Sequence, residues 1–172
     1  MYEAWHRDGK RHGDDVPAEV WRDPETGNIT KESWRRDGIP HRDGNLPARR
    51  SISKSGIFTE ESYYRLGQPH REDGPAIVQR DLKTGNLTCQ NWYLHVRFDR
   101  PDDGPVIEHR DANTGVVTYE EYHDLGGNIL HRGDGPAIIE RDPKTGQVIH
   151  EEFYSHGEPW PAPNGGVETL DI

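Results

Sequence analysis

The chain lacks most of the features that mark the common protein classes. It has one cysteine, Cys89, among its 172 residues, so no disulfide can form within it and we expect a reducing compartment. It has no apolar run of membrane-spanning length, and its first residues carry neither the basic nor the apolar segment of a secretory signal. These absences lead us to expect a soluble, cytoplasmic protein.

Hydrophobic residues are also scarce. They make up 30% of the chain, and even with its 19 glycines the total stays below the roughly 45–50% of ordinary globular domains on that count. A thick closed core is therefore not expected, whereas an elongated array, in which each unit buries its apolar face against its neighbours, needs fewer such residues. Disorder is disfavoured because aromatic and β-branched residues recur at fixed positions.

Basic residues are few, and lysine is rarer than arginine. Five lysines accompany 16 arginines, and the formal net charge is −10. A phosphate-backbone binder needs clustered basic residues, so direct nucleic-acid binding is not expected, and an anionic membrane is an equally poor target. The excess of arginine indicates guanidinium groups that pair with carboxylates and stack on aromatic rings.

What the chain does have is a unit copied five times. Prolines recur at residues 17, 47, 75, 105 and 136, at intervals of 30, 28, 30 and 31 residues. An aromatic residue keeps nearly the same interval, at Trp5, Trp34, Tyr63, Trp92, Tyr122 and Phe153. Such periods predict a repeat protein. We place the units at about 5–33, 34–62, 63–91, 92–121 and 122–152, followed by a partial sixth repeat or C-terminal cap over 153–172.

The third unit shows what each copy is expected to build. Residues 75–81 are rich in β-branched side chains and open at a proline, which the first position of a strand tolerates. Gly85 then offers the positive φ of a tight turn, and residues 87–93 return as a second strand. Residues 67–74 combine Gly, Pro and Asp, as a structured connecting loop does.

Together the units predict an all-β fold. We expect an elongated, single-layer, twisted antiparallel sheet of five tandem β-hairpins, with about ten strands. Because side chains on one face of a strand recur with period two, the repeating aromatic residues should form a stripe on one face and supply the core.

The repeating motif resembles a known family. The motif consists of an aromatic residue, a glycine four positions later, and then His-Arg-x-Asp-Gly-Pro-Ala before a hairpin. This pattern is similar to the MORN-like variant repeats of bacterial and giant-virus proteins, which include a YwqK-like antitoxin group. The match runs from Trp5 to about Gly157 and is best in repeats three and five. The resemblance implies single-layer stacks of hairpins, partner binding and, in one subset, neutralisation of a toxin.

Histidines and acids share one phase of the repeat. They are His41, His70 and His131, with His12 close to that phase, and the nearby Asp43, Asp73 and Asp134. A metal ladder is one interpretation, but one histidine and one carboxylate per turn leave a tetrahedral site incomplete. We expect these side chains to hold the loop by hydrogen bonds to the backbone, with no metal and no cofactor.

Paired glutamates beside aromatic residues raise glycoside hydrolysis as an alternative. The pairs are Glu120 with Glu121 and Glu151 with Glu152. Hydrolases of this kind need two carboxylates facing each other across a cleft, whereas neighbours in a strand point to opposite faces. An exposed aromatic row with acidic neighbours could instead bind sugar rings. Since no nucleophile triad, phosphate-binding glycine loop or paired-cysteine motif is found, we predict that the chain is not an enzyme.

The leading hypothesis is a non-catalytic protein that binds another protein as an inhibitor, such as an antitoxin, an immunity protein or a phage counter-defence factor. A basic toxin or nucleic-acid enzyme would complement its acidic charge. Irregular parts of the repeats should carry the specificity, because the regular parts build the scaffold. The candidate partner-binding residues are Arg49, Arg50, Lys54, His95, Arg97, Phe98, Arg100 and Trp160.

The alternative hypothesis is an acidic mimic of nucleic acid, or a sponge whose arginines capture an anionic nucleotide or another small ligand. Those arginines follow the prolines by five residues, at Arg22, Arg80, Arg110 and Arg141, while repeat two has Ile52 there. A sheet with two open edges could also form a homodimer. The tail over residues 160–166 is a further irregular stretch that could bind the partner, or it could act as a cap that shields the exposed edge of the last strand.

Overall fold

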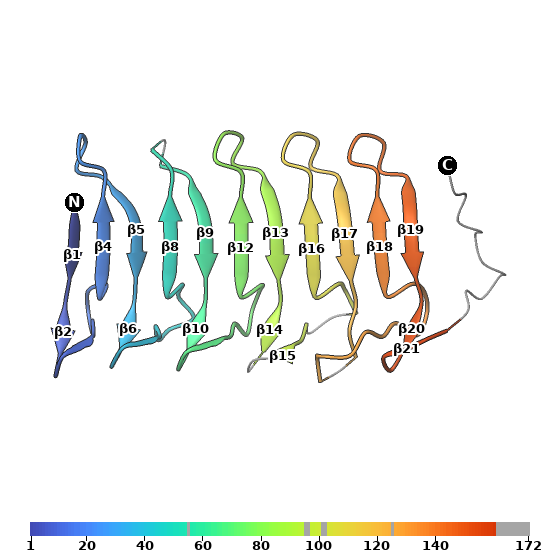
Figure 1. The fold of residues 1–172 in the computed structure, drawn as a ribbon, viewed down its shortest axis with the longest axis horizontal. Helices are drawn as coiled ribbons and strands as arrows, with labels where there is room; N and C mark the ends of the chain where they lie inside the picture. The colour runs from blue at the N-terminus through green and yellow to red at the C-terminus, as the bar shows by residue number, and fades with distance from the viewer. Residues whose placement is uncertain (55, 95–96, 101–102, 125, 161–172) are drawn as a thin grey trace.

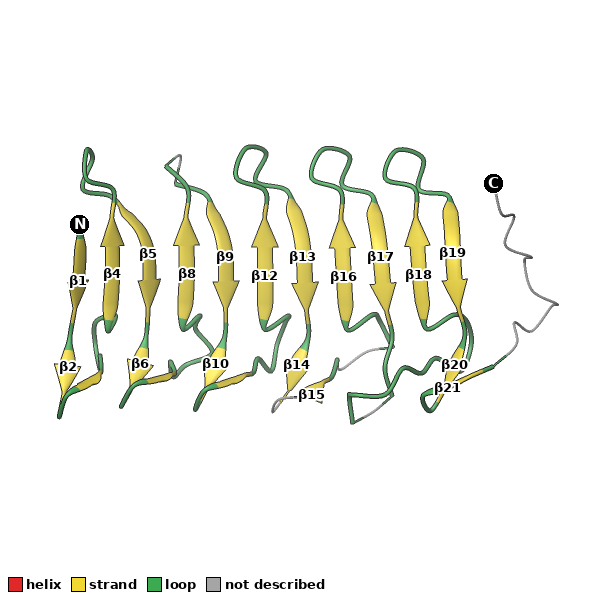
Figure 2. Ribbon diagram, in the orientation of Figure 1, coloured by secondary structure: helices red, strands yellow, loops and turns green. Residues whose placement is uncertain are grey.

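The computed structural model describes residues 1–160 except 55, 95–96, 101–102 and 125. Eleven strands form one antiparallel sheet in the order β1-β4-β5-β8-β9-β12-β13-β16-β17-β18-β19 (Figures 1 and 2). The strands are β1 (Tyr2–Ala4), β4 (Glu19–Arg22), β5 (Ile29–Ser33), β8 (Arg49–Ile52), β9 (Phe58–Ser62), β12 (Ile77–Arg80), β13 (Leu87–Asn91), β16 (Ile107–Arg110), β17 (Val117–Glu121), β18 (Ile138–Arg141) and β19 (Val148–Glu152). The predicted elongated, single-layer hairpin array is confirmed.

Four of the five long hairpins close through a turn that is held by one aspartate, and in repeat two Ser53 takes this place and accepts the Ile57 amide at 3.1 Å. Asp81 Oδ1 accepts hydrogen bonds from the amides of Lys83 and Thr84, at 2.9 and 2.8 Å, and from the Thr84 hydroxyl. Gly85 follows with a φ of 75°, the left-handed conformation that favours glycine. The same arrangement recurs at Asp23, Asp111 and Asp142.

The ascending strand of each repeat starts two residues later than the sequence suggested. In repeat three β12 begins at Ile77 rather than at Pro75. Pro75 has no N–H to donate to the sheet, and the Ala76 carbonyl instead accepts the amide of Tyr63 at 2.7 Å. The Asp-Gly-Pro segment is thus the bend that leads into the strand.

The connectors contain a second, short hairpin that was missed. Five such pairs are β2 (His6–Arg7) with β3 (Lys10–Arg11), β6 (Arg35–Arg36) with β7 (Ile39–Pro40), β10 (Tyr64–Arg65) with β11 (Gln68–Pro69), β14 (Tyr93–Leu94) with β15 (Arg97–Phe98), and β20 (Tyr154–Ser155) with β21 (Glu158–Pro159). They lie beyond one end of the long strands, in a row along the array (Figure 2). Repeat five has a single bridge there, between His123 and Leu130.

The core is built mainly from small residues. The alanine after each proline is 0% exposed at Ala18, Ala48, Ala76 and Ala137, and Val106 takes this place in repeat four. The predicted aromatic stripe contributes unevenly: Tyr63 and Tyr122 are 8% exposed, but Trp5 is 39% exposed. Close packing against the loops therefore depends on residues with little volume. No helix capable of spanning a membrane occurs among the described residues.

Candidate functional site

The stripe of aromatic residues is covered by arginines from the loops. The guanidinium carbons of Arg42, Arg71, Arg100 and Arg132 lie 3.8, 4.1, 4.5 and 4.0 Å from the ring centres of Trp34, Tyr63, Trp92 and Tyr122. Arg42 Nη1 and Arg100 Nη1 each also donate to the carbonyl of the following repeat proline, at 3.2 and 3.0 Å. Repeat one has Gly13 at this phase, which explains the exposed ring of Trp5.

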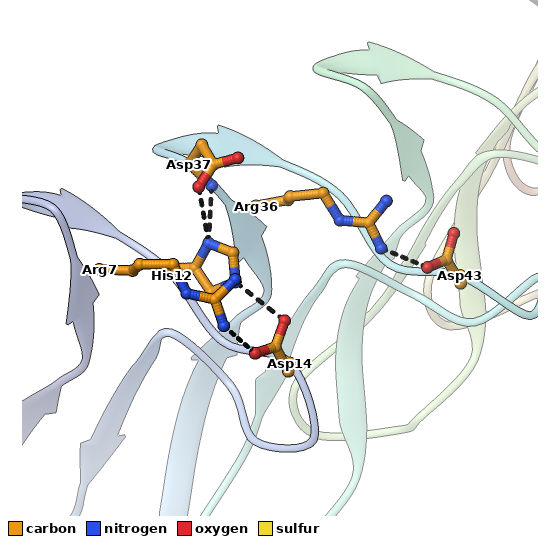
Figure 3. Close-up of polar contacts among 6 residues, drawn as sticks. All are labelled: Arg7, His12, Asp14, Arg36, Asp37 and Asp43. Atoms are coloured by element: carbon orange, nitrogen blue, oxygen red, sulfur yellow. Dashed lines mark hydrogen bonds and ion pairs between the residues drawn. The ribbon is translucent and has the colours of Figure 1, made fainter.

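Loop histidines of repeats one, two and five bind the backbone of the repeat that follows. His41 Nδ1 accepts the Leu66 amide of repeat three at 3.1 Å, and its Nε2 lies 3.0 Å from Asp43 Oδ1. Because Nδ1 accepts an N–H here, Nε2 carries the proton and donates to the carboxylate. His12 makes the equivalent contacts with Asp37 and Asp14 (Figure 3). The hydrogen bonds predicted for these histidines are present, and they reach across the junction between repeats.

Exposed carboxylates mark the tips of the same loops. The side chains of Asp14, Asp43, Asp73 and Asp134 are 58%, 72%, 65% and 83% exposed. Hydrogen bonds from Arg36 and His41 hold the pKa of Asp43 below its usual value, and Arg71 does the same for the pKa of Asp73. Asp14, Asp43 and Asp73 are therefore ionised at neutral pH, and the loop end of the sheet carries a row of acidic side chains.

The row of arginines proposed for anion capture is largely engaged by glutamates. Arg22 Nε lies 3.0 Å from Glu3, Arg110 Nε lies 2.6 Å from Glu108, and Arg141 Nη2 lies 2.9 Å from Glu120. Arg80 is exposed. An anion arriving at this face would have to displace a carboxylate from three of the four positions, which disfavours capture.

The adjacent glutamates point to opposite faces, as predicted for neighbours in a strand. Glu120 binds Arg141 and accepts the Tyr122 hydroxyl at 3.1 Å. Glu121 instead accepts the Tyr119 hydroxyl at 2.5 Å and lies 2.6 Å from His123 Nε2. His123 holds the pKa of Glu121 below its usual value. These contacts give each glutamate a separate set of structural partners, and the two carboxylates do not face each other.

The predicted partner-binding residues do not form one patch. Arg49 lies over the Tyr64 ring, Arg50 binds Glu32, and Lys54 lies 3.4 Å from Asp23 at the far, turn end of the sheet. Phe98 stacks on Tyr93 with ring centres 4.3 Å apart.

The remaining predicted residues are spread over the loop end of the sheet. Arg97 is exposed, Arg100 covers Trp92, and Trp160 is 38% exposed. The amide of Trp160 donates to the Phe153 carbonyl, so Trp160 takes the histidine position of a sixth repeat. His95 and residues 161–166 of the tail lie outside the described residues.

A pocket that the sequence did not predict lies between the loops of repeats four and five. It has a volume of about 370 Å³, and its lining includes Asp99, Asp103, Asp124 and His123. The only sequence signal was that these two repeats depart from the pattern: Asp99 stands where other repeats have histidine, and Asp124 where repeats one to three have arginine.

Over the described ranges, no group of three or more His, Cys, Asp and Glu side chains is arranged to hold a metal ion. No family model matches the chain, and neither a curated protein nor a solved structure matches it.

Proposed function

We propose that this chain is a non-catalytic repeat protein that binds another protein through the loop end of its sheet and inhibits it. The observation that carries the proposal is the row of exposed carboxylates at Asp14, Asp43, Asp73 and Asp134. Each is fixed by arginine or histidine partners, so binding would require little further ordering of the loops.

The spacing of the row favours a macromolecular partner. Each repeat adds two strands to the sheet, so equivalent loops recur at steps of roughly 10 Å. A small ligand would meet one loop or two, whereas a protein with an extended basic surface can meet several at once. Opposite potentials of this kind accelerate encounter and fix orientation. The partner class is therefore a basic protein, such as a toxin or a nucleic-acid enzyme.

The inhibitory role is supported by the resemblance to MORN-like repeats of the antitoxin-related group. The fold and the repeat motif agree with that resemblance, which is part of the proposal. An antitoxin, an immunity protein and a phage counter-defence factor would each bind a partner protein, and the partner's own activity distinguishes them.

The test is affinity capture with the full chain as bait and a variant in which Asp14, Asp43, Asp73 and Asp134 are replaced by asparagine. Melting temperature confirms that both baits are folded. We expect a basic protein that is retained by the native chain, lost from the variant and released by salt, and whose activity falls when the chain is added. Equal retention by both baits, or turnover of a substrate by the chain itself, would refute the proposal.

A competition experiment separates mimicry of nucleic acid from other binding. If the partner is a nucleic-acid enzyme and the chain occupies its substrate groove, added duplex should displace the chain. If duplex leaves the complex intact, the chain binds elsewhere on the partner.

A further inference from the structure

The loops of repeats four and five enclose the pocket of about 370 Å³ described above. Four carboxylates line it, from Asp99, Asp103, Asp124 and Asp134, against the two guanidinium groups of Arg100 and Arg132. Both guanidinium groups are already engaged, because they lie over Trp92 and Tyr122 and donate to the carbonyls of Pro105 and Pro136. The pocket therefore has more hydrogen-bond acceptors than donors.

Repeats one to three fill the equivalent place with an arginine of their own. Arg7 pairs with Asp14 and Arg36 with Asp43 (Figure 3), and Arg65 lies 3.8 Å from Glu72. Each of these arginines is the second residue after the stripe aromatic. The same position holds Leu94 in repeat four and Asp124 in repeat five. The chain thus omits its own guanidinium from the pocket and places a further carboxylate there.

Two of the acids have side chains that no described residue engages. In the part of the chain that the structure describes, no hydrogen bond or ion pair engages the side chain of Asp99 or Asp103, whereas Asp134 pairs with Arg132 at 2.9 Å. From the described residues, the Asp124 side chain accepts one long hydrogen bond, 3.3 Å, from the Gly127 amide. Arg97 on β15 is exposed and is not among the described residues that line the pocket, and none of the described contacts is an ion pair between it and these carboxylates.

A buried histidine adds an independent sign of an incomplete site. The side chain of His123 is 6% exposed, and its Nε2 lies 2.6 Å from Glu121, to which it donates. Nδ1 is then an acceptor, and it is buried with no partner in the described residues. His123 lines the pocket. A buried polar atom that lacks a partner is unfavourable, so a donor that reaches Nδ1 would form a favourable hydrogen bond.

We infer that this pocket binds the guanidinium group of an arginine side chain supplied by the protein partner. A guanidinium is planar, always charged and carries five N–H donors, which suits carboxylates arranged around one space. Arg36 in repeat two is the internal template for this contact. The inference deepens the proposed function by naming the group on the partner that the chain recognises.

The junction of repeats two and three provides a matched control. Its pocket, of about 210 Å³, is lined by Asp43, Arg65 and Glu72 among others, and Tyr64 stands where repeat five has His123. Both of its acids are already paired, Asp43 with Arg36 and His41 and Glu72 with Arg65 and His70. Arginine should not bind there.

The test is an NMR titration of the full chain with N-acetyl-arginine amide. We expect saturable shifts of the Gly104, Gly126 and Gly127 amides and of the His123 ring nitrogens, and none at Gly44. The citrulline analogue, which is neutral and of the same shape, should produce no saturable shift. Equal shifts with citrulline, or equal shifts at both junctions, would overturn the inference.

Two variants sharpen the test. Asp124→Arg restores the internal arginine of repeats one to three and should abolish the shifts. His123→Tyr copies repeats three, four and six and should weaken binding about tenfold, the effect of one charge-assisted hydrogen bond. The His123→Tyr result decides if Asp124→Arg does not fold. A partner captured equally well by the native chain and by folded variants would refute the pocket inference and leave the proposed function standing.

Discussion

Replacing Arg42 by methionine should lower the free energy of unfolding by about 2 kcal/mol. Its guanidinium carbon lies 3.8 Å from the centre of the Trp34 ring, a partly buried cation–π contact that contributes about 1 kcal/mol. Its Nη1 also donates to the Pro47 carbonyl at 3.2 Å, a bond whose loss costs about 1 kcal/mol more. Burial, with repulsion from Arg50, holds the pKa of Arg42 below its usual value, yet the group stays charged. Methionine keeps the apolar stem, so these two contacts are what the substitution removes.

Urea unfolding, followed by circular dichroism and tryptophan fluorescence, measures the loss. Arg42→Lys should fall between the native chain and Arg42→Met, since an ammonium keeps the charge but cannot lie flat on the ring while donating to Pro47. A double-mutant cycle with Trp34→Leu should give a coupling of about 1 kcal/mol. If Arg42→Met changes stability by less than about 0.5 kcal/mol, the range of neutral surface substitutions, or if the coupling is zero, the arginine is not part of the core.

Three further predictions follow from the loops and turns. His41→Phe removes the acceptor of the Leu66 amide, so hydrogen exchange at that amide should become roughly tenfold faster, while the distant Gly157 amide serves as the unchanged control. Gly127→Ala should lower the free energy of unfolding by more than about 2 kcal/mol, because φ is +75° and a Cβ would lie 1.7 Å from the Phe98 carbonyl oxygen. Gly133→Ala is the control: a Cβ at Gly133 would meet nothing within 4 Å, so this variant should be neutral in the same unfolding assay. Hydrogen bonds from backbone amides hold the pKa of the turn aspartates below its usual value. Because the pKa is lower in the folded chain than in the unfolded chain, these aspartates stabilise the fold fully above the unfolded pKa of about 3.9, and this stabilisation is lost as the pH falls through the folded pKa. The urea concentration at the midpoint of unfolding should therefore decrease when the pH is lowered below about 4. This decrease should be smaller in a variant with asparagine at Asp23, Asp81, Asp111 and Asp142, and an equal decrease in the variant and the native chain would contradict this reasoning.

The long hairpins could be predicted because their signals are local. An aspartate, a Thr-Gly turn and alternating side chains all fall within one stretch, and Asp81 with Gly85 behaves as that pattern indicates. The short hairpins were missed although Asp8-Gly9 and Asp37-Gly38 carry a hairpin turn signal, with both residues of each pair at positive φ. Their strands have two residues each, too few for alternation to be recognised.

The candidate pocket could not be predicted, because it depends on contacts between repeats. Asp99 and Asp124 are each visible as departures from the pattern, but only the register of the sheet places their two loops together. The same holds for His41, whose acceptor bond to Leu66 spans 25 residues. That irregular repeats carry partner specificity stays a prediction.

The histidine bonds described above have a direction, and that direction bears on how the chain folds during synthesis. His12 and His41 each accept an amide from the repeat that follows, as does His131, so a loop is completed by residues made later. Repeats one, two and five therefore stay unfinished until about one more repeat has left the ribosome, and the folding of their loops should follow synthesis with a delay of one unit. At the far end Trp160 occupies the histidine position, in a repeat for which the described chain offers no successor.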